Sequence, residues 1–282
     1  MARVLPRQFV APNRAAEIAE LAEAVADEHC SSLPVEPAQI ARNKRITASF
    51  GQYGPNTFDG LLEHIQCRFH MFCNVDRVGD AAGPRARFTL AHELGHYFID
   101  EHRRPLQAGR AGPHGSQCEH ESPILAEQEA DLFAANLLMP GGRFVRQAGG
   151  VSPGMDGIRR LAERFGTSIT AAAIRYAEAD VQPCLVIKWD WSGYAWKRIS
   201  ASAFAAYLRT TYRALRDLPP DCPTRKAIAR QAPPECGYFQ AGTTAAAWLP
   251  RIKTGDWRDA IFIEQAMPLG RFGVLTFLYA AR

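Results

Sequence analysis

The stretch RFTLAHELGHYFIDEH, residues 87–102, carries the order HExxH in His92, Glu93 and His96. Its apolar residues recur at helical spacing, which predicts a helix over residues 86–100. Residues four apart lie on the same side of a helix, so His92 and His96 can bind one ion together. Glu93 is rotated by about 100° from His92, which favours a general base beside the ion over a ligand. The pattern therefore predicts a zinc-binding helix.

A catalytic zinc site needs three protein ligands, so a third ligand must be found. His102 has the spacing of the longer motif HExxHxxGxxH, but Ile99 occupies its glycine position. A β-branched residue resists the left-handed backbone of that bend, and in a continuing helix His102 turns about 240° away from His96. We therefore interpret His102 as a surface or helix-end histidine. Gly95 is expected to leave room for substrate backbone beside the site.

The sequence EQEADLFAANLLMP, which begins at Glu127, offers the other solution. Glu127 and Asp131 are four residues apart and share a helix face. Glu127 is the predicted third ligand, and Asp131 is predicted to receive the free N–H of a ligand histidine. Glu129 lies off this face, which favours a surface position or a pair with Arg or Lys. The alternative is a polar helix start that binds no metal.

Composition excludes several classes of protein. The 282 residues are 47% hydrophobic and 22% charged, with a formal net charge of +4, which is a globular balance and no argument for a nucleic-acid partner. No run approaches the roughly 20 apolar residues of a membrane helix, and no signal peptide is recognisable, so we expect a cytoplasmic protein without a membrane partner. The seven cysteines include no CxxC pair and are expected to be reduced. Cys118 lies two residues before His120, which makes a second metal site conceivable, but a polar loop is the favoured interpretation.

Periodicity and turn residues predict an α+β fold: a small sheet with flanking helices, then a helical hairpin and a β-rich C-terminal region. The expected domains are a peptidase-like domain over 1–150, the hairpin over 151–180 and an α/β region, sensory or regulatory, over 181–282. Expected helices span 14–28 with Asn13 as N-cap, 38–42, 86–100 and 127–139. Expected strands span 58–65, 68–74, 183–189, 194–200, 259–266 and 271–280, and loops span 79–84, 103–123 and 217–236.

Residues 157–179 have the pattern of a helix-turn-helix. A DNA reader aims side chains of its second helix at base edges, and this helix offers only Thr170 and Arg175 for that task. A structural hairpin is favoured over a DNA reader, and both interpretations stay open.

The joint pattern RFTLAHELGHYF with E-x-E-A-D-x-F-A-A-x-L-L-M-P resembles the ImmA/IrrE family of zinc metallopeptidases. FDGLLEHI and FHMFCN before it are similar to the strand pair of that family. The resemblance covers about residues 35–145 and implies a thermolysin-like minimal core. It implies one zinc ion on His92, His96 and Glu127, with Glu93 as catalytic base and Asp131 at a position where the family has Asp or Asn.

The same resemblance implies a zinc-dependent endopeptidase that cleaves a helix-turn-helix repressor or an antitoxin, and so controls stress-response or mobile-element genes. Strand 68–74 is a candidate to pair with an extended substrate, and Tyr97, His114 and His120 are candidates to stabilise the oxyanion. The basic loop from Arg103 to His120 departs from the family pattern and leaves the substrate open. The alternative is a DNA-binding or ligand-sensing regulator with a vestigial peptidase core.

Overall fold

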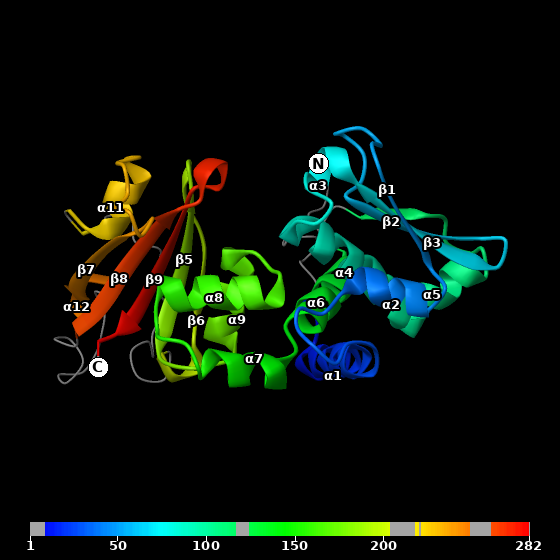
Figure 1. Cartoon of the computed structure of the whole chain (residues 1–282), viewed down its shortest axis with the longest axis horizontal. Helices are drawn as coiled ribbons and strands as arrows, with labels where there is room; N and C mark the ends of the chain where they lie inside the picture. The colour runs from blue at the N-terminus through cyan, green and yellow to red at the C-terminus, as the bar shows by residue number, and fades with distance from the viewer. Residues whose placement is uncertain (1–8, 117–123, 204–217, 220, 249–260, 282) are drawn as a thin grey trace, which may run out of the picture. The chain divides into compact units, whose positions relative to one another are not determined.

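A computed structural model describes residues 9–116, 124–203, 218–219, 221–248 and 261–281 of the chain. The chain divides into two compact units (Figure 1). The first comprises residues 1–143 with 163–168, and the second comprises 144–162 with 169–282. The predicted hairpin region thus contributes to both units. The functional roles of the predicted domains stay predictions.

The first unit is rich in helices, three of which begin at a proline. Pro12, Pro37 and Pro84 occupy first-turn positions, where the missing N–H has no helical partner to lose. Asn13, the predicted N-cap, therefore lies inside the first helix, and Ala11 is its N-cap. The helices are α1 (Pro12–His29), α2 (Pro37–Asn43), α3 (Val75–Val78), α4 (Pro84–Phe98), α5 (Asp100–Gln107) and α6 (Leu125–Leu138).

A four-stranded sheet completes this unit, in the order β1-β3-β2-β4. Its strands are β1 (Thr47–Gly51), β2 (Gly60–Ile65), β3 (Arg68–Asn74) and β4 (His114–Ser116). Strand β3 pairs in parallel with β1, and the other pairs are antiparallel. Gln66 and Cys67 join β2 to β3 with φ of 50° and 61°. These left-handed values suit a two-residue hairpin turn, although the sequence pair is not a standard one.

Helix α4 lies at the centre of the first unit, between the sheet and α6, with α1 packed on α6 (Figure 1). Leu90, Ala91 and Leu94 belong to its buried core. The sequence suggested that Gly95 leaves room for substrate backbone, and this prediction is wrong. A Cβ at Gly95 would lie 3.0 Å from Cα of Ala130 in α6, so this glycine permits the close approach of the two helices.

The predicted loop over 103–123 is confirmed for residues 108–113 but wrong for 103–107, which belong to α5, and for 114–116, which form β4. Helix α4 ends because Ile99 is extended, with φ −76° and ψ 111°, and α5 starts at the next residue. The chain thus changes direction without the glycine that the longer zinc motif uses. Residues 117–123, with Cys118 and His120, lie outside the described residues.

The second unit contains a five-stranded antiparallel sheet in the order β6-β5-β9-β8-β7. Strand β7 and helices α7, α11 and α12 were not predicted, and α11 lies in a region expected to be irregular. The strands are β5 (Cys184–Asp190), β6 (Gly193–Ile199), β7 (Phe239–Thr244), β8 (Ile261–Pro268) and β9 (Val274–Ala280). The helices are α7 (Gly141–Ala148), α8 (Met155–Phe165), α9 (Ile169–Glu178), α11 (Pro223–Ile228) and α12 (Ala245–Trp248), with a 3-10 turn η2 (Gly270–Phe272).

Helices cover both faces of this sheet, because alternate residues of a strand point to opposite sides. Tyr176 of α9 contacts the ring of Phe277, with centroids 5.8 Å apart. The neighbouring Leu278 lies in a separate core with Ala227 of α11 and Trp248 of α12. The mixed helices and sheets confirm the predicted α+β class. Among the described residues, every helix is too short or too polar to cross a membrane.

Candidate metal centre

His92 and His96 lie one helical turn apart on α4 and present their rings to the same point. Their side chains are almost completely buried, and the two Nε2 atoms are 3.1 Å apart. The ring centroids are 4.9 Å apart. This is the arrangement expected from four-residue spacing, in which one helix supplies two donors to one ion.

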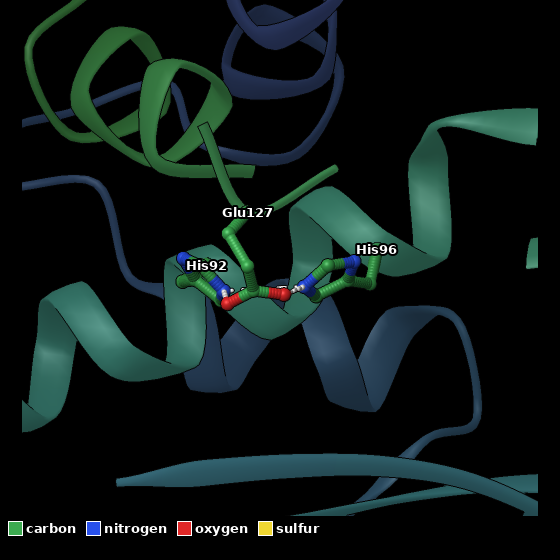
Figure 2. Close-up of side chains that lie close together, drawn as sticks. All are labelled: His92, His96 and Glu127. Carbon is green, nitrogen blue, oxygen red and sulfur yellow. Dashed lines mark hydrogen bonds and ion pairs between the residues drawn. The ribbon is translucent and has the colours of Figure 1, made fainter. Parts of the chain in front are cut away.

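Glu127, in the first turn of α6, brings a carboxylate to both rings. Figure 2 shows its carboxylate between the two imidazoles. Oε2 lies 3.3 Å from Nε2 of His92, and Oε1 lies 3.2 Å from Nε2 of His96. The close packing of α6 on α4 at Gly95 holds these groups together, although about 30 residues separate them in the chain.

The spacing of these donors fits a divalent metal ion. One ligand atom from each of His92, His96 and Glu127 lies within 4.8 Å of the others. Tetrahedral ligands at zinc–nitrogen or zinc–oxygen distances of about 2.0–2.1 Å are about 3.4 Å apart from one another. The two Nε2 atoms are 3.1 Å apart, and each lies 3.2–3.3 Å from a different oxygen of Glu127, which is close to that value. Two imidazoles and a carboxylate are also the donor set of many catalytic zinc sites.

Asp131 lies one turn after Glu127 on α6 and contacts the other nitrogen of His92. Its Oδ1 is 2.8 Å from Nδ1 of His92. An Nδ1–H donated to this carboxylate leaves Nε2 as a lone-pair donor, which is the form that binds a metal.

Burial and charge act in opposite directions on these groups. Burial alone lowers the pKa of His92, but hydrogen bonds to Asp131 and Glu127 and the charge of Glu93 raise it to about 10. Burial raises the pKa of Glu127, but the same contacts with His92 and His96 hold it well below its usual range. The pocket therefore stabilises positive charge beside Glu127, whether carried by a proton or by a metal ion.

Comparisons with known proteins add the family. A peptidase family model described as the IrrE N-terminal-like domain matches residues 80–176. Over residues 80–176 the chain is similar to this IrrE N-terminal-like domain. The family is one of metallopeptidases, which implies a metal ion, and the cluster of His92, His96 and Glu127 is suited to hold one. The match begins before α4 and ends within α9.

The fold is also found among solved structures. A Mycobacterium tuberculosis transcriptional regulator aligns with a TM-score of 0.58 and 15% sequence identity. The alignment covers 95% of this chain and 90% of that chain. At this identity the likeness concerns the fold alone. A comparison with curated protein sequences gave no match.

Glu93 is fully buried beside the start of β2. A Cβ at Gly60 would lie 2.4 Å from Oε1 of Glu93 and 2.6 Å from Cγ2 of Thr89. Gly60 therefore leaves the space that the Glu93 side chain occupies. The register that pairs Gly60 with Cys73 and Ser116 fixes this position of the strand above the helix.

If Glu93 is the catalytic base that the sequence predicts, Gly60→Ala should reduce peptide cleavage strongly while leaving metal affinity nearly unchanged. The added methyl group collides with Glu93 but lies on strand β2, whereas the candidate metal ligands lie on helices α4 and α6. A displacement of a catalytic group by about 1 Å costs on the order of 100-fold in rate. Parallel measurement of cleavage rate and bound metal tests this. Gly112→Ala, where a Cβ meets nothing, is the matched control. Equal loss of metal and activity would contradict the prediction.

His102 differs from expectation, and Glu129 meets one of its two predicted alternatives. His102 is not a surface histidine: its side chain is 9% exposed, and its Nδ1 lies 3.2 Å from Nδ1 of His96. Glu129 is also buried and not at the surface, and it forms the alternative predicted pair with an arginine, Arg14. The sequence carries no local signal for these contacts, because they depend on the turn at Ile99 and on the packing of α1.

The sequence also offered Tyr97, His114 and His120 as candidates, and of their side chains only that of Tyr97 is described. Tyr97 packs its ring on Phe69, with centroids 5.1 Å apart, in the core below the sheet. His114 lies on β4, and His120 lies outside the described residues. Strand 68–74 cannot receive a substrate strand, because β3 is paired on both sides by β1 and β2.

Proposed function

We propose that this protein is a zinc-dependent endopeptidase, with His92, His96 and Glu127 as zinc ligands and Glu93 as catalytic base. The observation that carries the proposal is the meeting of these three donors at separations of 3.1–3.3 Å. The match to a metallopeptidase family and the buried carboxylate of Glu93 on the same helix support it. Zinc is the proposed ion because two histidines and one glutamate are the catalytic zinc ligands of known metallopeptidases.

In this mechanism the protein orients the reactants and moves one proton. Zinc, when bound, supplies Lewis-acid activation of the water nucleophile and of the scissile carbonyl. Glu93 takes a proton from the attacking water on a carboxylate oxygen and passes it to the leaving amine. Asp131 holds the proton on Nδ1 of His92, so that Nε2 stays a ligand. The apolar neighbours Leu90 and Leu94 exclude water from the helix behind these groups.

An extended substrate is proposed to pair with the edge strand β4 in place of the strand suggested by the sequence. Strand β4 is the last of the sheet, and no described strand pairs with its outer side. Ser116 lies opposite Gly60, whose backbone adjoins Glu93. Addition of a peptide at a free sheet edge supplies main-chain hydrogen bonds.

The proposed substrate is a helix-turn-helix repressor or an antitoxin, whose cleavage would release stress-response or mobile-element genes. A small helix-turn-helix protein encoded beside this chain is the first substrate to test. Co-incubation with and without a chelator, followed by mass spectrometry of the fragments, is the experiment. Cleavage that stops with chelator and returns with zinc supports the proposal, and an intact partner under all conditions opposes that substrate.

A regulator that binds DNA is the second candidate, since the similar solved structure is named a transcriptional regulator. Helix α9 follows Gly166 and Ser168 as the sequence predicts, but its Ala172 and Tyr176 face is buried. Thr170 and Arg175, the only base-reading candidates, are half-buried. This arrangement favours a structural hairpin. A salt-dependent mobility shift with promoter DNA would favour the regulator.

Metal binding is expected to release protons and to strengthen with rising pH. The pKa of His92 is raised from 6.5 to about 10, so the metal-free cluster holds a proton at pH 7 that a metal ion must displace. Because the metal ion displaces this proton, metal affinity rises with pH, roughly tenfold per pH unit below about 10. In the metal-free protein the proton stabilises the fold fully below about 6.5, and this contribution is lost as pH rises through about 10.

Calorimetric titration in two buffers with different ionisation enthalpies measures the protons released per ion. About one proton released at pH 7 is the expected result. His64→Gln, which changes a histidine four residues along β2 from Gly60, is the matched control and should release the same number. Metal binding without proton release, at an affinity independent of pH, would show that His92 of the metal-free protein holds no extra proton at pH 7.

A further inference from the structure

Nδ1 of His92 contacts a carboxylate directly, whereas Nδ1 of His96 begins a line of hydrogen-bonded side chains that leads to a carboxylate through a second histidine. Its Nδ1 lies 3.2 Å from Nδ1 of His102, and Nε2 of His102 lies 3.0 Å from Oε2 of Glu129. The side chains of His102 and Glu129 are 9% and 8% exposed. Helices α4, α5 and α6 each contribute one member of this line, which the proposed mechanism does not use.

Only one arrangement of protons satisfies this line when His96 binds a metal through Nε2. The remaining proton of His96 is then on Nδ1, so His96 donates and Nδ1 of His102 accepts. His102 therefore carries its proton on Nε2 and donates it to Glu129, whose carboxylate can only accept. Each contact has one donor and one acceptor, and all of them point away from the metal-binding cluster.

Arg14 of α1 balances the charge at the far end. Its Nε and Nη2 lie 3.1 and 3.3 Å from the two carboxylate oxygens of Glu129. A buried carboxylate needs such a compensating, hydrogen-bonded charge to stay ionised. Arg14 also pairs with Glu101 of α5 at 3.1 Å, which ties α1 to the helix that carries His102. The acceptor for His102 is thus held in place from two sides.

We propose that His102 is a positioning residue that keeps His96 in its metal-binding tautomer, with Glu129 and Arg14 fixing His102 in turn. The inference rests on the proposed function, because it assigns His102 to the histidine that binds the metal. The break at Ile99 makes it feasible, since it ends α4 and turns α5 back so that His102 faces His96. His92 and His96 would then be oriented by different chemistry, an anion for one and a neutral imidazole for the other.

Two substitutions of similar character separate this role from a purely structural one. In His102→Asn, the amide oxygen stands where Nδ1 was and still accepts from His96, but the side chain does not reach Glu129. In His102→Gln, the amide nitrogen stands where Nε2 was and still donates to Glu129, but no acceptor faces His96. If His102 serves only as a hydrogen-bond donor to Glu129, the Gln variant should bind zinc more tightly than the Asn variant. If His102 positions His96, the Asn variant should bind zinc more tightly.

The test is zinc affinity of the full chain, measured by competition with a chelator, with metal-free folding checked by circular dichroism. We expect His102→Asn to bind within about threefold of wild type and His102→Gln to bind about 10–100-fold more weakly, the usual loss when the partner of a ligand histidine is removed. His64→Asn and His64→Gln are the controls and should both match wild type. Equal affinities of the two His102 variants, or tighter binding by His102→Gln, would overturn the assignment.

A second measurement needs no variant at position 102 to fold. Nitrogen-15 spectra of histidine-labelled, zinc-loaded wild type report which ring nitrogen carries each proton. The expected pattern is a proton on Nδ1 of His96 and on Nε2 of His102, and a proton on Nδ1 of His102 overturns the proposal. Wild type that binds no zinc at all overturns the proposed function and this inference with it, whereas zinc binding with the opposite tautomer overturns the inference alone.

Discussion

Glu93→Gln is expected to abolish peptide cleavage while the protein keeps its metal. Glutamine has nearly the size and shape of glutamate, so the fully buried side chain still fits beside Gly60. Its neutral amide cannot take a proton from water, and loss of a general base typically costs about 10²–10⁴-fold in rate. Glu93 is not one of the three predicted ligands, so the substitution leaves His92, His96 and Glu127 in place to hold the metal.

Single-turnover cleavage of the proposed helix-turn-helix substrate measures the loss of activity. The zinc content of the purified variant measures whether the metal is kept. Glu63→Gln, the same substitution on the half-buried strand β2, is the matched control and should cleave normally. A Glu93→Gln protein that cuts as fast as wild type would refute the mechanism. A variant that loses zinc as well as activity would instead place Glu93 among the ligands.

Glu127→Gln is expected to remove tight metal binding and, with it, cleavage. The substitution keeps the shape of the side chain but replaces the anionic oxygen donor that faces Nε2 of both His92 and His96. Loss of a group that only orients a ligand costs about 10–100-fold in metal affinity, so loss of a ligand should cost at least ~100-fold. Two histidines alone fall short of the three protein ligands of a catalytic site.

Thermal unfolding with and without zinc gives a readout that is independent of activity. A ligand present at about 1,000 times its Kd stabilises the native state by about 4 kcal/mol, so wild type should gain a clear increase in Tm with zinc. Glu127→Gln should gain little or none, and the Glu63→Gln control should behave as wild type. An equal increase in Tm for Glu127→Gln would exclude Glu127 from the metal site.

The sequence predicted the helix that carries HExxH, the later helix that carries Glu127 and the two central strands. The bounds of β3 are as predicted, and the other three elements differ by one or two residues at their ends. These elements were predictable because strong periodicity and a motif coincide within them. The turn residues Gln66 and Cys67 adopt φ values that their types do not indicate. Helices α5, α7 and α11 were missed because they are short, proline-flanked or glycine-flanked, and helical only within the fold.

The sequence analysis singled out Gly95 but assigned it the wrong role. The sequence suggested a space for substrate, whereas the structure places Ala130 of α6 against it. Strand β3 is a similar case, because pairing with β1 closes the edge that an extended substrate would need. In both cases the local pattern was recognised and the neighbour was unknown, since packing partners distant in the chain leave no periodic signal.

By itself the sequence determined that two imidazoles and a glutamate share one helix, and that acidic residues follow on a second helix, because fixed helical geometry converts spacing into direction. Only the tertiary structure decided which acidic residue meets which histidine. Glu127 reaches Nε2 of both histidines, whereas Glu129, two residues on, reaches His102 and Arg14. The physical reason is that the approach of α6 to α4 and the turn at Ile99 depend on packing between segments far apart in the chain.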